Sequence, residues 1–225
     1  MTKNNISTIT IDGPSGVGKG TVTLQLAQHL NWHILDSGAI YRVLAYAAQK
    51  QSLQATQETE LTQLASDLDL QFQQTTETIE VILDRENVAN ELRTESCGNF
   101  ASKIATLAPV RQALLQRQRN FLKSPGLIAD GRDMGTVVFP DAALKLFLTA
   151  SAEERAQRRY KQLKQKGMDV NIGDLINDIA ERDKRDTQRT VAPLVPASDA
   201  LVIDTTTLSI KEVMQQILAL VNKVI

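Results

Sequence analysis

The sequence predicts an α/β protein: a five-stranded parallel sheet with helices on both faces, plus a small antiparallel β insert. The prediction depends on short apolar runs and on the helical patterns between them. Continuous apolar character, rather than alternation, is typical of strands that are covered on both faces. Strands that alternate with helices along a chain favour a parallel sheet. The five runs are "ISTITID" (6–12), "HILD" (33–36), "LIAD" (127–130), "LKLFL" (144–148) and "ALVID" (200–204).

Helices are expected over 21–30, 151–166 and 209–224, among other stretches between the runs. The first has an apolar residue at every fourth position, which gives one apolar stripe. Each of the other two opens with a serine followed three residues later by a glutamate. That spacing is the signature of a capping box and marks the start of a helix.

One segment, about 70–93, departs from this pattern. Alternation at Ile79, Val81 and Leu83, with breaks at "TTE" and "DREN", predicts a small antiparallel meander. The meander is inserted between the second and third strands of the main sheet. It is expected either to support the fold as a plain hairpin or to cap a substrate.

Composition restricts the partners. Lys and Arg number 25 and Asp and Glu 26, so a net charge of -1 offers no basic field for a nucleic acid. The single cysteine, Cys97, excludes an internal disulfide and suits a reducing compartment. No apolar run approaches the roughly 18–20 residues that span a membrane, and the first residues lack a signal-peptide pattern. We therefore expect a cytoplasmic protein with neither nucleic-acid nor membrane partners, and a monomer because no exposed apolar helix stands out in the sequence.

The stretch "GPSGVGKGT" (13–21) is close to the phosphate-binding pattern G-x-x-x-x-G-K-[ST], but Gly20 replaces the final hydroxyl residue. It follows a predicted strand and opens a predicted helix, which is the context that the motif needs. Glycines let backbone N–H groups converge on phosphate oxygens, and the helix N-terminus adds partial positive charge. Lys19 can bridge the terminal phosphates. The sequence thus predicts a P-loop NTPase-type fold that binds a nucleoside triphosphate, while leaving kinase, switch and motor open.

Two further polar clusters follow predicted strands, "LDSGAIYR" (35–42) and "IADGRDMGT" (128–136). Ligands of doubly wound sheets bind outside the carboxyl ends of the strands. Asp130 is placed where P-loop enzymes carry the acid that organises magnesium and its waters, and Arg132 could bind an acceptor phosphate. Helix capping and turn chemistry are the alternative interpretation of both clusters.

Arginines gather on one face of each of two predicted helices. The planar guanidinium suits bidentate binding of phosphate, and its charge is permanent. An arginine-lined lid facing a triphosphate would stabilise a phosphoryl group in transfer. Ordinary solvated helix faces, with Arg182 and Asp186 as an i,i+4 pair, are the alternative. The arginines are Arg155, Arg158 and Arg159 in the first helix and Arg182, Arg185 and Arg189 in the second.

Together these motifs resemble the bacterial cytidylate kinases, a family of nucleoside-monophosphate kinases. The resemblance rests on "GPSGVGKGT", "LDSGAIYR", "ADGRDMGTVVFPDA", "ERAQRR" and "ERDKRD" followed by "APL". It extends from the first strand to the last helix, and the stretch 74–91 matches only loosely. It implies transfer of a phosphoryl group from MgATP to CMP or dCMP, giving ADP and CDP or dCDP, with Mg²⁺ as the cofactor.

The resemblance also implies domain boundaries and residue roles. It gives a single kinase domain over 1–225, with a core of about 1–60 and 105–225, a monophosphate-binding insert of about 61–104 and a lid of about 152–190. Mg²⁺ would be held mainly by phosphates and water, near Asp130. The ATP-binding residues would be Gly13, Pro14, Ser15, Gly16, Val17, Gly18, Lys19, Gly20, Thr21, Arg155, Arg158 and Arg159.

The remaining roles concern CMP and catalysis. Arg42 and Arg132 would bind the CMP phosphate; Arg111, Asp133 and Arg189 the base; and Ser102, Arg182 and Asp186 the ribose side. The whole set for CMP is Ser37, Tyr41, Arg42, Ser102, Arg111, Arg132, Asp133, Arg182, Asp186 and Arg189. Catalysis would depend on Lys19, Arg132, Arg159 and Arg189.

Two other functions stay open at this point. One is another small P-loop kinase that acts on UMP or a different acceptor. The other is a non-kinase nucleotide-dependent switch, although such proteins keep Ser or Thr after the loop lysine, where this chain has Gly20. The G-K-G-T form, with Thr21 supplying a hydroxyl one residue later, is that of nucleoside-monophosphate kinases.

Overall fold

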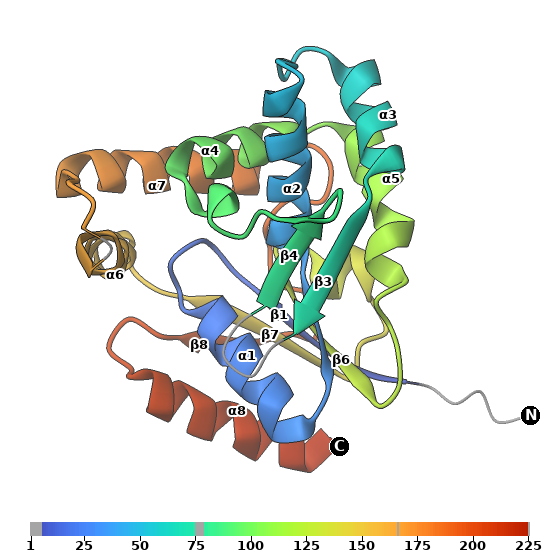
Figure 1. The fold of residues 1–225 in the computed structure, drawn as a ribbon. Helices are drawn as coiled ribbons and strands as arrows, with labels where there is room; N and C mark the ends of the chain where they lie inside the picture. Colours follow the sequence, from blue (N-terminus) through green and yellow to red (C-terminus); the bar gives the residue numbers. More distant parts are fainter. Residues whose placement is uncertain (1–5, 75–78, 166, 225) are drawn as a thin grey trace, which may run out of the picture. The chain divides into compact units, whose positions relative to one another are not determined.

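The computed structural model describes residues 6–74, 79–165 and 167–224. The chain divides into two compact units (Figure 1). The first unit comprises Met1–Leu35 and Phe121–Ile225, and the second comprises Asp36–Asn120.

The first unit is built on a five-stranded sheet in the order β2-β6-β1-β7-β8. β1 is the central strand, and it pairs in parallel with β6 on one side and β7 on the other. β7 in turn pairs in parallel with β8. The predicted five-stranded parallel sheet is confirmed. Its strands are β1 (Ser7–Asp12), β2 (His33–Asp36), β6 (Gly126–Gly131), β7 (Leu144–Thr149) and β8 (Leu201–Asp204).

The apolar runs form strands because both faces of the sheet are covered. Ile9 and Ile11 of β1 and Ile128 of β6 are fully buried. Burying one such side chain contributes about 1.5–3 kcal/mol of transfer free energy. These residues anchor the central strands, and the loops at their carboxyl ends are held in place as a result.

Helices connect the strands of the first unit. α1 and α8 lie side by side, as Figure 1 shows in blue and red. The capping box predicted for the last helix is present, since Ser209 Oγ accepts from Glu212 N (3.3 Å) and the Glu212 carboxylate accepts from Ser209 N (2.8 Å). The elements are α1 (Lys19–Leu30), a π-turn η2 (Met134–Val138), α6 (Ala152–Gln165), α7 (Ile172–Gln188) and α8 (Ile210–Val224).

The second unit contains the predicted antiparallel meander, in the strand order β3-β4-β5. Asp84 and Arg85 connect β4 to β5 with φ angles of 49° and 70°. Positive φ at both central residues is the geometry of a type I′ hairpin turn, so the break at "DREN" is confirmed. The break at "TTE" lies outside the described residues. The strands are β3 (Leu70–Gln74), β4 (Ile79–Leu83) and β5 (Glu86–Asn87).

Helices make up the rest of the second unit. α2 packs against α3 and α4, and α3 packs against α5. The chain enters α2 through Asp36, whose carboxylate accepts from Ala39 N at 2.9 Å and so caps the helix. The elements are α2 (Ser37–Lys50), α3 (Glu58–Asp67), a 3₁₀ turn η1 (Glu91–Arg93), α4 (Glu95–Ile104) and α5 (Ala108–Arg119).

Within the described ranges, no helix combines the length and the apolar character needed to cross a membrane.

Candidate active site

The glycine-rich loop joins β1 to α1, and its backbone favours glycine at three positions, of which Gly13 and Gly16 also make the closest contacts. Gly13 has a φ of 145°, and a Cβ there would lie 2.1 Å from the Leu148 carbonyl oxygen. Gly16 has a φ of 82°, and a Cβ there would lie 3.0 Å from Cβ of Arg155. The loop therefore packs closely against β7 and α6 of the same unit. Gly20 differs, because a Cβ there would meet nothing within 4 Å.

Lys19, the first residue of α1, is folded back onto this loop. Its Nζ donates to the carbonyl oxygens of Gly13 and Pro14, both at 2.8 Å, and lies 3.9 Å from the Asp130 carboxylate. Burial, reinforced by the positive charge of Arg132, lowers the pKa of Lys19 to about 7. A phosphate bound here would add negative charge beside the buried ammonium group and favour its charged form.

Asp12, at the end of β1, was missed in the sequence analysis. Its two carboxylate oxygens accept from the backbone nitrogens of Met134 and Gly135, each at 2.8 Å. Burial raises the pKa of Asp12 to about 6, although both of these hydrogen bonds act in the opposite direction. Asp12 thereby fixes η2 and the polar turn before it, Arg132 and Asp133, against the start of the glycine-rich loop. Its place directly before Gly13 was the only signal in the sequence.

The polar turn after β6 forms ion pairs with α7 and with the residue that follows α7. Arg132 Nε donates to the Asp186 carboxylate at 2.9 Å, and Arg189 lies 3.6 Å from Asp133. Burial opposes the charged form of Asp186, but the guanidinium groups of Arg132 and Arg182 outweigh it and lower its pKa. The same pairing raises the pKa of Arg132 in spite of burial. The structure thus brings together these five residues, all of them predicted for the CMP site.

Arg155, predicted to bind ATP, holds protein groups in this structure. Its guanidinium makes a bidentate ion pair with Asp183 of α7 and donates to the Ser15 carbonyl at 3.2 Å. Its Nε also donates to Ala150 O at 3.1 Å. One buried arginine therefore ties α6, α7 and the glycine-rich loop to each other.

The other two arginines of α6 lie closer to the surface. Arg158 donates to Glu154 and to the carbonyl oxygen of Thr205, at 2.9 and 2.6 Å. Thr205 follows β8, and its hydroxyl donates to Val17 O of the glycine-rich loop at 3.2 Å. Arg159 donates to Gln162 on the same helix at 2.6 Å. Asp183 and Thr205 were both missed from the sequence: Asp183 lies within "ERDKRD" but was given no role there, and Thr205 belongs to no local motif.

The second unit carries the other residues predicted for CMP. Arg42 Nη1 donates to Leu92 O at 3.0 Å, and Arg111 Nη1 to Ala105 O at 3.2 Å. The guanidinium of Arg111 lies 5.8 Å from the centre of the Tyr41 ring, within cation–π range. Two buried serines complete the set, Ser37 at the start of α2 and Ser102 on α4.

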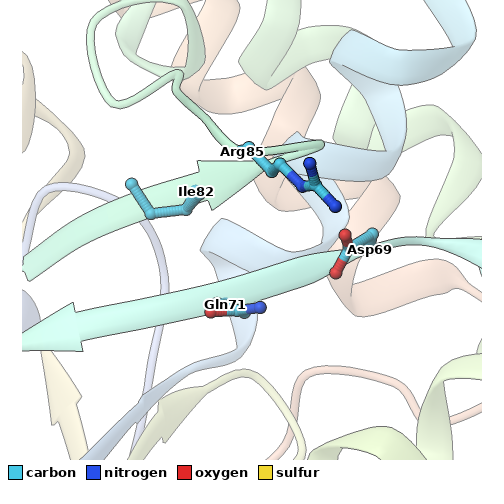
Figure 2. Close-up of a pocket in the computed structure, with 4 residues that line it drawn as sticks. All are labelled: Asp69, Gln71, Ile82 and Arg85. Atoms are coloured by element: carbon cyan, nitrogen blue, oxygen red, sulfur yellow. The ribbon is translucent and has the colours of Figure 1, made fainter.

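A small cavity of about 260 Å³ lies on the meander of the second unit. Figure 2 shows its lining, with Asp69 and Gln71 beside or on β3 and Ile82 and Arg85 on or after β4. None of these four residues was predicted to bind a ligand. Over the ranges described, no group of three or more His, Cys, Asp or Glu side chains could hold a metal ion.

Fold and site together define a P-loop protein of the nucleotide-dependent phosphotransferase class. Its marks are a glycine-rich loop between a central parallel strand and a helix, a buried lysine on that loop and arginines from the neighbouring helices.

Comparison with known proteins narrows the class. The family model described as cytidylate kinase matches residues 9–223. The cytidylate kinase of Shewanella frigidimarina is 59% identical over 96% of this chain and 95% of its own length. That of Aeromonas salmonicida is 60% identical over 94% of this chain and 92% of its own length. The chain belongs to the cytidylate kinase family, and its members are nucleoside-monophosphate kinases.

Among solved structures, a shikimate kinase from Bacteroides thetaiotaomicron is similar over 96% of this chain and 98% of its own, with a TM-score of 0.45 and 14% identity. That likeness is too distant to bear on function.

Proposed function

We propose that the protein transfers the γ-phosphoryl group of ATP to CMP or dCMP, giving ADP and CDP or dCDP. Membership of the cytidylate kinase family supports the choice of acceptor. The observation on the structure that carries the proposal is Lys19, a buried ammonium group that donates to two loop carbonyls and has its pKa lowered to about 7.

Lys19 is the residue that we assign to the transferred phosphoryl group of ATP. In the proposal its Nζ gives up the carbonyls of Gly13 and Pro14 and donates to phosphate oxygens instead. The glycine-rich loop, residues 13–21, contributes backbone N–H groups at the positive end of α1. The exchange is favourable because charge-assisted bonds to phosphate are stronger than bonds to neutral carbonyls.

The chemistry needs no strong general base, because a phosphate monoester is already an adequate nucleophile. Catalysis depends on holding two anions in line and on neutralising the charge that develops between them. Arg132, Arg159 and Arg189 are proposed for this neutralisation. Arg155 is proposed to act on ATP through Ser15, since its guanidinium is bound to that carbonyl and to Asp183.

The residues proposed to bind CMP are supported by separate contacts within each unit. From the second unit come Ser37, Tyr41, Arg42, Ser102 and Arg111, two of them arginines that donate to carbonyls. From the first come Arg132, Asp133, Arg182, Asp186 and Arg189, the ion-pair cluster at the carboxyl end of β6.

A divalent cation fits the donors near the loop. The buried carboxylate of Asp130 lies 3.9 Å from Lys19, and among the described residues no cluster offers three protein ligands. Mg²⁺ usually keeps several waters and takes its other ligands from one or two carboxylates and from phosphates. Asp130 is the residue proposed to orient its waters, and the ion would neutralise phosphate charge. A cytoplasmic location and a monomeric state stay predictions from the sequence.

The proposal is tested by steady-state kinetics with saturating MgATP and a panel of acceptors: CMP, dCMP, UMP, AMP, GMP and none. We expect kcat/KM for CMP and dCMP to exceed the values for the other acceptors by at least about tenfold. A higher kcat/KM for UMP or AMP would mean that the enzyme is a kinase with a different phosphoryl acceptor. ADP release that is indifferent to every acceptor would contradict the kinase assignment itself.

A further inference from the structure

A buried hydrogen bond in the second unit joins a predicted substrate residue to one that has no predicted role. Ser37 Oγ, in the first turn of α2, donates to Gln118 Oε1 of α5 at 2.7 Å. Both side chains are almost fully shielded, with Ser37 4% exposed and Gln118 2%. The two residues are 81 positions apart, so no local motif could have indicated the pair.

The direction of this bond follows from the other end of the amide. Gln118 Nε2 donates to the backbone carbonyl of Leu114 at 3.4 Å. A carbonyl oxygen can only accept, so the amide nitrogen faces Leu114 and the amide oxygen faces Ser37. An amide oxygen also only accepts, and the hydrogen of Ser37 is therefore used in the bond to Gln118. The lone pairs of Ser37 Oγ are what remains for any other partner.

This polarity restricts what Ser37 can bind. Phosphate oxygens are acceptors, so a serine whose hydrogen points at Gln118 cannot donate to them. A ligand group that meets Ser37 must itself be a donor. The exocyclic amine of cytosine is one, whereas the corresponding group of a 4-oxo pyrimidine such as uracil is an acceptor. The hydroxyls of a sugar are donors as well.

We infer that Gln118 is a positioning residue. By accepting the hydrogen of Ser37, it leaves the serine oxygen to accept a hydrogen bond from a donor group of the nucleotide that receives the phosphoryl group. The inference rests on the proposed function. If a ligand places a hydrogen-bond acceptor beside Ser37 Oγ, two lone pairs face each other. This is unfavourable because a buried polar group then lacks its hydrogen bond. Gln118 thus favours nucleotides with a donor at this position, through Ser37 and without touching them.

A purely structural role is the competing explanation, in which the bond only stabilises the packing of the second unit. The two explanations differ in whether Gln118 acts through Ser37. A bond that only stabilises the packing leaves the ratios of kcat/KM between nucleotides unchanged. A positioning role changes such a ratio when Gln118 is replaced, and has no further effect on it once the Ser37 hydroxyl is gone, which a double-mutant cycle measures.

The experiment combines Gln118→Met with Ser37→Ala and measures kcat/KM for CMP, dCMP and UMP at saturating MgATP. Methionine approximates the volume of glutamine and cannot accept the serine hydrogen. We expect Gln118→Met to lower kcat/KM for CMP about tenfold, the loss that corresponds to one buried hydrogen bond left unsatisfied. The KM for ATP should stay unchanged. In the Ser37→Ala background the same substitution should change kcat/KM less than about twofold, since nothing remains for Gln118 to orient.

The three nucleotides show which donor group meets Ser37. If Gln118→Met lowers the ratio of kcat/KM for CMP to that for UMP, the donor is the cytosine amine. If it changes the ratio for CMP to that for dCMP, the donor is the sugar 2′-hydroxyl, and either result supports the inference. Gln112→Met, an exposed position on the same helix, is the matched control and should behave as wild type. Equal effects of Gln118→Met in both backgrounds, or unchanged substrate ratios, would overturn the inference.

A second variant guards against loss of folding in Gln118→Met. A glutamate buried at position 118 stays protonated, so in Gln118→Glu its hydroxyl can donate to Leu114 O in place of Nε2 while its other oxygen accepts from Ser37. The CMP:UMP and CMP:dCMP ratios of Gln118→Glu should stay near wild type, and one of them should change in Ser37→Ala. Ratios unchanged in both variants would refute the inference. Failure of the wild-type protein to form CDP would instead refute the proposed function, so the two failures are distinguishable.

Discussion

The arginines of the two units differ in what holds them. In the first unit three arginines form ion pairs with carboxylates from other parts of the chain. In the second unit the two arginines predicted to bind CMP donate to backbone carbonyl oxygens, as the exposed Arg117 also does. The ion pairs are Arg132–Asp186, Arg155–Asp183 and Arg189–Asp133, and the carbonyl contacts are Arg42–Leu92 and Arg111–Ala105.

The difference has a consequence for anion binding. A carboxylate cancels a full unit of charge, whereas a carbonyl offers only a dipole that orients the guanidinium. An arginine held by a carbonyl therefore retains more of its attraction for a phosphate. An arginine held by a buried carboxylate contributes to the fold, and it must share or give up that partner when a phosphate binds.

The largest effect is expected from the lysine in the first unit. Lys19→Ala should lower kcat by roughly 10²–10³-fold, the loss typical of removing one group that stabilises transition-state charge. Steady-state kinetics with CMP would measure it. Gly20→Ser is the matched control in the same loop, and it should leave ATP binding largely intact because a Cβ at Gly20 meets nothing within 4 Å. Near-full activity of Lys19→Ala would show that the loop is not the catalytic cradle.

Removing the carboxylate of a buried arginine ion pair should lower the free energy of unfolding. Asp186→Asn should lower the free energy of unfolding by about 3 kcal/mol, because a buried guanidinium loses its counter-charge. Urea denaturation monitored by circular dichroism measures the change. Glu181→Gln removes the exposed partner of Arg185 on the same helix, and it should cost less than about 1 kcal/mol. Equal losses in the two variants would contradict the distinction between buried and exposed pairs.

The pH dependence of stability should depend on Asp12. Its pKa is raised from 3.8 to about 6 in the folded state, so the folded protein binds the proton more tightly than the unfolded chain. The contribution of Asp12 is fully present below about pH 4 and is lost as the pH rises through about 6, with a total of about 3 kcal/mol. The stability of the wild type relative to Asp12→Asn should therefore fall over this range in denaturation curves at several pH values. A difference that is constant with pH would contradict the raised pKa.

Replacing an arginine that donates to a backbone carbonyl should impair CMP binding more than stability, the reverse of what we expect for Asp186→Asn. Arg42→Met should raise KM for CMP about tenfold, the size expected for one hydrogen bond between charged groups. The free energy of unfolding should change by less than about 1 kcal/mol, because no buried carboxylate is left unpaired. Kinetics and denaturation of the one variant provide both readouts. A large decrease in the free energy of unfolding with an unchanged KM would contradict the proposed difference between arginines held by carbonyls and arginines held by carboxylates.

Local patterns in the sequence were sufficient for the main elements. The apolar runs predicted all five strands of the sheet within a residue or two, because continuous burial leaves a mark on consecutive residues. The capping pair Ser209 and Glu212 marked the start of α8. Glycines of the phosphate loop were identified because their spacing forms a motif of nine residues, although their close contacts with Leu148 and Arg155 were not visible in it.

Contacts between distant residues were not predictable in this way. Asp12 accepts from residues more than 120 positions away, and Asp183 binds an arginine 28 positions earlier. Arg155 shows what this means for function. Its position on a helix face predicted contact with ATP, and only the fold shows that Asp183 and a loop carbonyl hold it.

In the proposed reaction the phosphate loop and its arginines deliver a phosphoryl group from ATP to CMP. The most direct test uses ATP labelled at the γ-phosphate and follows the label in the presence and absence of CMP. We predict that the label appears in CDP in a one-to-one ratio with ADP, and that little inorganic phosphate forms. Recovery of the label in inorganic phosphate, at a rate that does not respond to CMP, would contradict phosphoryl transfer to CMP.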